Sequence, residues 1–103
     1  MLGSPQPPGV TRRLSSSDVS GPSDRLARAV ELLASGAWQQ AHGIVQQENS
    51  ALAAWLHGIV HTLEGDLDNA RYWYRRAKRA FPGPDAVQAE IAAARRTVRG
   101  GSR

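Results

Sequence analysis

The helical spacing of the apolar residues is the feature that most limits how this chain can fold. From Ser20 onward, apolar side chains recur every three or four positions, and no stretch alternates apolar and polar residues as a half-buried strand would. Glycines and prolines interrupt this spacing and divide the chain into short segments. The sequence therefore predicts an all-α fold in which five helices are joined by short connections.

Each expected helix has its own start and stop signals. Serine and aspartate at the start of a segment accept hydrogen bonds from the first backbone amides of a helix, and glycine after a segment favours its end. By these signals the predicted helices span residues 23–34, 37–47, 51–64, 67–81 and 84–99. They make up a helical-repeat domain (20–99), with a disordered tail rich in proline, glycine and serine before it (1–19) and a frayed terminus after it (100–103).

The sequence contains an internal repeat of one helical hairpin. A shift of 29 residues aligns Gly36 with Gly65 and Ala41 with Ala70. The glycines fall between two helical segments, where a turn is needed, and the alanines let neighbouring helices approach closely. A repeated hairpin of this kind favours a stack of helix pairs in which each pair covers the apolar face of the next.

The second hairpin, residues 51–84, resembles a tetratricopeptide repeat. The residues that carry the resemblance stand at spacings used by that family: Trp55, Gly58, Gly65, Ala70, Tyr74, Ala77 and Pro82. The resemblance implies two antiparallel helical hairpins plus a C-terminal capping helix, and a protein-binding module in place of an enzyme. The same segment also resembles small bacterial helical proteins to which no biochemical role is attached.

The resemblance places partner binding on the concave surface formed by the first helix of each hairpin. On this chain that surface would be apolar and would comprise Leu26, Val30, Leu33, Trp55, Ile59 and Leu63. Such a trough would take an amphipathic helix or extended segment of a protein partner, or a second copy of the chain in a homodimer. Alternatively, the same residues form the core of a compact bundle covered by the C-terminal helix, because two repeats alone bury little apolar surface.

Positive charge gathers on the fourth predicted helix. The cations there are interleaved with Tyr72 and Trp73, and four of them form a candidate anion-binding patch: Arg71, Arg75, Arg76 and Arg79. Arginine pairs well with phosphate and carboxylate groups, so the patch could bind nucleic acid or an acidic partner. The alternative is a solvated helix face, since cations are favoured near a helix C-terminus, and no helix-turn-helix or RNA-binding signature accompanies the patch.

The three histidines of the chain offer a possible metal site. His57 and His61 are four residues apart and therefore share one helix face, and His42 on the preceding helix could approach them. Three imidazoles can bind zinc or another borderline metal. The spacing is equally compatible with packed, hydrogen-bonded histidines, because the tetratricopeptide resemblance puts His57 and His61 at interior positions. No metal or cofactor is therefore assigned from the sequence.

Other classes of chemistry have few residues to support them. The chain has no cysteine, so disulfides, thiolate metal sites and thiol nucleophiles are excluded. The sequence contains no run of about 20 apolar residues, so no membrane span is predicted. It also shows neither a nucleophile paired with a base nor a phosphate-binding loop. We therefore expect a cytoplasmic protein that is not an enzyme. In the tail, Arg12 and Arg13 precede Ser15 in the pattern of a basophilic kinase substrate.

Overall fold

Helices make up most of residues 22–100, the part of the chain that the computed structural model describes. In chain order they are α2 (Pro22–Ala34), α3 (Trp38–Val45), α4 (Ala51–Glu64), α5 (Leu67–Arg76) and α6 (Val87–Gly100), with a short 3-10 turn η1 (Pro84–Ala86) before α6. No strand occurs within this range, so the predicted all-α fold is confirmed. The predicted tail with its Ser15 motif, and residues 101–103, lie outside the described residues.

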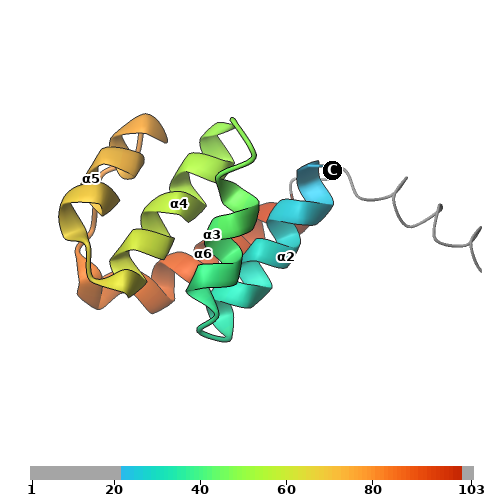
Figure 1. The fold of residues 1–103 in the computed structure, drawn as a ribbon, viewed down its shortest axis with the longest axis horizontal. Helices are drawn as coiled ribbons and strands as arrows, with labels where there is room; N and C mark the ends of the chain where they lie inside the picture. Colours follow the sequence, from blue (N-terminus) through green and yellow to red (C-terminus); the bar gives the residue numbers. More distant parts are fainter. Residues whose placement is uncertain (1–21, 101–103) are drawn as a thin grey trace, which may run out of the picture.

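The helices form two hairpins and a closing helix. α2 packs against α3, and α4 packs against α5, while contact between α3 and α4 joins the hairpins. The closing helix α6, orange to red in Figure 1, passes behind the hairpins and contacts both α2 and α4. The C-terminal helix thus returns to the first described helix.

A residue with positive φ follows each of α2, α4 and α5. Gly36 (φ 87°) follows α2 and Gly65 (φ 93°) follows α4, which are the two stops expected from the repeated hairpin. After α5 this place is taken by Lys78 (φ 62°), and the amide of Arg79 donates to the carbonyl of Tyr74 at 2.9 Å. A lysine at this place gives no stop signal in the sequence, since glycine is the usual residue there. The prediction that this helix continues to residue 81 is therefore wrong, and α5 ends at Arg76.

α4 lies at the centre of the molecule. Its residues 53–60 are all buried, which means that α4 is covered around its whole circumference. The largest fully buried side chains are Trp55, Tyr74, Leu33, Leu56, Ile59, Val30, Val45 and Val60. They come from four helices, so the two hairpins share one core.

Polar contacts fix α6 against the hairpins. The Glu90 carboxylate accepts hydrogen bonds from Trp55 Nε1 at 3.0 Å and from the Tyr74 hydroxyl at 2.7 Å, both through Oε1. Farther along α6, the Arg95 guanidinium donates to both carboxylate oxygens of Glu31 on α2, at 2.6 and 2.9 Å. Burial, followed by the nearby Glu90 carboxylate, raises the pKa of Tyr74, so this hydroxyl remains a donor to Glu90. These contacts hold α6 on one side of the bundle.

Candidate functional site

The apolar residues expected to bind a partner lie inside the molecule. Leu26, Val30, Leu33, Trp55 and Ile59 are at most 3% exposed, and Leu63 is partly buried against the same core. α6 covers this side, and its Ile91 and Ala94 belong to the core. The expectation of an open apolar trough is therefore wrong for this structure. The arrangement found is the alternative one, a core covered by the C-terminal helix.

The four candidate arginines are exposed, and three of them lie over aromatic rings. The guanidinium carbon is 3.5 Å from the ring centroid of Trp55 for Arg79, 5.2 Å from that of Trp73 for Arg76, and 5.4 Å from that of Phe81 for Arg71. Cations at these distances are attracted to the ring face. The sequence located the cations, but it could not pair Arg79 with Trp55, because that contact depends on how α5 packs against α4.

The outer face of α5 combines charge with one exposed ring. We use the name α5 face for Arg71, Tyr72, Arg75 and Arg76. Tyr72 is 42% exposed, and the Arg76 guanidinium lies 5.8 Å from its ring centroid and donates to its hydroxyl at 3.3 Å. The opposite side of α5 is buried against α4. The α5 face is therefore free of the core and carries three cations, of which Arg71 also lies 3.3 Å from the Asp68 carboxylate.

A shallow pocket lies between the start of α4 and the α5 face. Its volume is about 100 Å³, and its lining residues are Glu48, Asn49, Ser50, Ala51, Ala54, Trp73 and Arg76. Ser50 caps α4, since its hydroxyl accepts a hydrogen bond from the amide of Ala53 at 3.1 Å. The positive end of the α4 dipole and the Arg76 cation both border this pocket.

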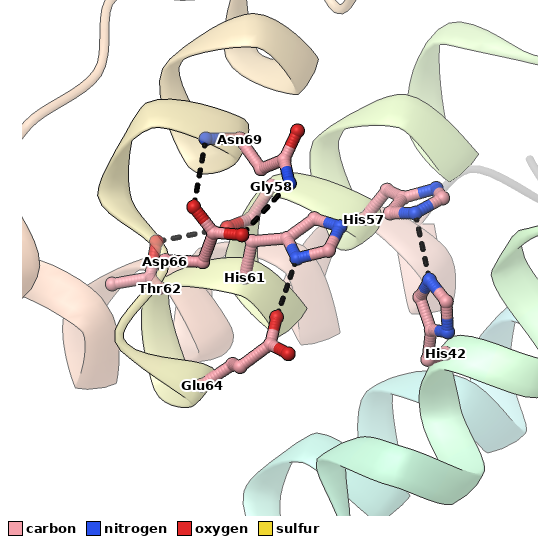
Figure 2. A network of polar contacts seen from close by, with 8 residues as sticks. All are labelled: His42, His57, Gly58, His61, Thr62, Glu64, Asp66 and Asn69. Carbon is pink, nitrogen blue, oxygen red and sulfur yellow. Dashed lines mark hydrogen bonds and ion pairs between the residues drawn. The ribbon is translucent and has the colours of Figure 1, made fainter.

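All three histidines of the chain meet beside α4 (Figure 2). His42 comes from α3, and His57 and His61 come from successive turns of α4. The Nε2 atoms of His42 and His57 are 3.1 Å apart, and the three ring centroids are 4.8 to 5.5 Å from one another. The three side chains that the sequence offered as a possible metal site are thus together in one cluster, which we call the imidazole cluster.

The neighbours of the imidazole cluster hold its rings in place and lower the pKa of His57. The indole of Trp73 on α5 stacks on His57 with 3.8 Å between ring centroids and 5° between planes. Glu64 Oε1 is 2.7 Å from His61 Nδ1, as Figure 2 shows. Burial lowers the pKa of His57 to about 4, with further contributions from the nearby His42 and His61. The sequence gave no signal for the Trp73 stack, because it depends on the packing of α5 on α4.

Acid is expected to destabilise the fold through His57. In the unfolded chain this group takes up a proton near its ordinary pKa of 6.5, whereas in the folded chain it stays neutral until the pH falls to about 4. The unfolded state therefore binds more protons in this window, so stability that is fully present above pH 6.5 is lost as the pH falls towards 4. We expect a loss on the order of 2 kcal/mol, measured by urea unfolding at a series of pH values. His57→Gln should remove most of that slope, and an unchanged slope would contradict the assignment.

Comparison of the chain with known protein families, with curated proteins and with solved structures found no match. Within residues 22–100, no helix is both long enough and apolar enough to cross a membrane. The α5 face and the imidazole cluster are therefore interpreted from their own geometry.

Proposed function

We propose that this protein is a helical interaction module that binds an acidic segment of a protein partner through the α5 face. The proposal keeps the partner-binding role implied by the tetratricopeptide resemblance and moves it from the buried apolar residues to an exposed surface. Among the described residues, no nucleophile is in contact with a base and an oxyanion donor, which supports binding over catalysis.

The observation that carries the proposal is the placement of guanidinium groups over aromatic rings. A guanidinium over a ring loses little further freedom when it binds a ligand, and its edge still offers N–H donors in a fork that fits a carboxylate. Arg76 holds this position over both Tyr72 and Trp73. Arg75 adds a further cation on the α5 face.

The pocket beside Arg76 favours a carboxylate over a nucleic-acid base. A volume of about 100 Å³ suits one short acidic side chain, and the α4 dipole adds to the attraction of Arg76 for negative charge. The Glu48 carboxylate also lines the pocket, and its charge is offset by an ion pair with Arg25 at 2.7 Å. Bases bind proteins largely by stacking on open aromatic faces. The Trp73 ring is already in contact with the His57 imidazole and the Arg76 guanidinium, so it offers little open face.

The test measures binding of a fluorescently labelled oligoglutamate peptide to the full chain by anisotropy. We expect affinity to fall steeply between about 50 and 200 mM salt, because the contacts are between charges. The double variant Arg75→Glu, Arg76→Glu should weaken binding about tenfold or more. The matched comparison is between the single variants Arg76→Glu and Arg28→Glu, which make the same change of charge. Arg28 lies on α2, at the other end of Figure 1 from α5.

Two results would count against the proposal. One is equal loss of peptide binding in Arg28→Glu, because the attraction would then come from net charge alone. The other is tighter binding of a single-stranded oligonucleotide of equal charge than of the peptide, which would favour a nucleic-acid surface.

A further inference from the structure

The three imidazoles are spaced much as the ligands of one tetrahedral ion would be. With metal–nitrogen bonds of about 2.0–2.1 Å, ligand nitrogens lie about 3.3 Å apart and imidazole ring centres about 5 Å apart. Here the Nε2 atoms of His42 and His57 are 3.1 Å apart, and the three ring-centroid separations are 4.8, 5.1 and 5.5 Å. One ligand nitrogen from each residue lies within 4.8 Å of the other two. Small side-chain rotations therefore suffice to bring all three onto an ion.

The carboxylate of Glu64 prepares His61 for this role. Its Oε1 is 2.7 Å from His61 Nδ1, and this contact favours the tautomer with its proton on Nδ1 and its lone pair on Nε2. Figure 2 shows the second ring nitrogen of His61 directed to the side on which His57 lies. A carboxylate behind a ligand histidine is the usual support for a metal-binding imidazole, because it fixes the ring and raises its basicity.

The geometry points to a binding site for one borderline divalent metal ion, with Nε2 of His42, His57 and His61 as its protein ligands. Zn²⁺ is the ion best suited to three imidazoles in a tetrahedral set, and Co²⁺, Ni²⁺ and Cu²⁺ share the preference for nitrogen donors. Mg²⁺ and Ca²⁺ prefer oxygen ligands and are disfavoured. Three protein ligands leave a fourth position for water or an exchangeable ligand.

Two of the rings indicate which side chain moves when an ion binds. The planes of His57 and His61 are only 19° apart, so one of them has to turn before both lone pairs meet at one point. His57 is held by its stack on Trp73. His61 is therefore the ring that turns, and Glu64, whose side chain is 39% exposed, can follow it.

Packing alone is a poor explanation for this cluster. A hydrogen bond between His42 and His57 needs one protonated and one unprotonated Nε2, and it satisfies only one nitrogen of each ring. Apolar side chains would fill the same space without needing hydrogen-bond partners for ring nitrogens. A metal ion engages all three nitrogens at once.

Metal binding would also connect the two hairpins, because His42 belongs to α3 and the other two ligands belong to α4. An ion that binds only the folded state raises the melting temperature. At a free concentration 100 times its dissociation constant, the expected rise is about 10–20 °C for a domain of this size.

The experiment is a calorimetric titration of Zn²⁺ into the full chain, with a parallel thermal melt. We expect one ion per chain, a higher melting temperature with Zn²⁺, and no response to Mg²⁺. His42→Gln and His61→Gln should abolish stoichiometric binding, and Glu64→Gln should weaken it about 10–100-fold. Circular dichroism and a melt without metal establish that each variant is folded, so that a loss of binding is not a loss of structure.

Asp66→Asn is the matched control, because His61, Glu64 and Asp66 form a second group with suitable ligand spacing. Asp66 caps α5, and asparagine caps a helix equally well, so the fold should be retained. Unchanged affinity in this variant, with loss in His42→Gln, would support the imidazole site. The inference is overturned if the natural chain binds no zinc stoichiometrically, if His42→Gln binds as well as the natural chain, or if Asp66→Asn removes binding.

Discussion

Replacing Trp55 with alanine is expected to lower the free energy of unfolding by about 3–5 kcal/mol. The side chain is 2% exposed, so its removal leaves a large cavity between α4 and α6. The change also takes away the indole donor to Glu90 and the ring beneath the Arg79 guanidinium. Because small domains are stable by only about 5–15 kcal/mol, the variant should be close to unfolding at room temperature. Urea unfolding followed by circular dichroism measures the loss.

The control for this prediction is Tyr72→Ala, which removes an aromatic ring from the surface. Tyr72 is 42% exposed, and we expect its loss to cost less than about 1 kcal/mol. Similar losses for the two variants would mean that Trp55 does not lie in the core. An open trough and a covered core would both make the chain sensitive to the loss of Trp55, so the size of the loss is the informative quantity.

Substitution of Gly58 by alanine is expected to cost about 3 kcal/mol, although alanine is the better helix former. A Cβ atom at this position would lie 2.5 Å from Cδ1 and 2.8 Å from Cε1 of Tyr74, and 3.3 Å from the carbonyl oxygen of Ala70. The ring cannot easily move away, since it is fully buried, packs against Phe81 and is bonded through its hydroxyl to Glu90. The two helices of the second hairpin would therefore have to separate.

Gly43 offers a matched test of that explanation. It also lies within a helix, α3, but a Cβ atom there would meet nothing within 4 Å. Gly43→Ala should therefore leave stability unchanged or raise it by about 0.5–1 kcal/mol. The two variants carry the same chemical change, and only Gly58→Ala should lower the thermal melting temperature. A fall of equal size in both would show that close approach at Gly58 is not the cause.

The sequence predicted the helices well because their signals are local. Gly36 and Gly65 end α2 and α4 through their own backbone preference, and Ser50 starts α4 through its own hydroxyl. Lys78 has no such preference, and tertiary packing decides its conformation. For that reason the sequence predicts a helix that extends beyond the observed end of α5.

The sites were harder to predict because they depend on which surfaces meet. A covered apolar face and an open one have the same sequence pattern, and the modest stripe of α6, with Ile91 and Ala94, left open whether α6 covers α2 and α4. The placement of His57 and His61 on one face of a helix follows from helix geometry alone. The position of Trp73 against His57 does not, since it requires the packing of α5 on α4.

The return of α6 to α2 sets the order in which this chain can complete its fold during synthesis. α2 is the first described helix to be made, yet the helix that covers its apolar side is the last. Until Val87 and the residues after it are available, the sides of α2 and α4 that contact α6 have no cover. A nascent chain at this stage exposes the kind of surface that chaperones recognise and that promotes aggregation. A product that stops before α6 would keep that surface permanently and become a substrate for quality control.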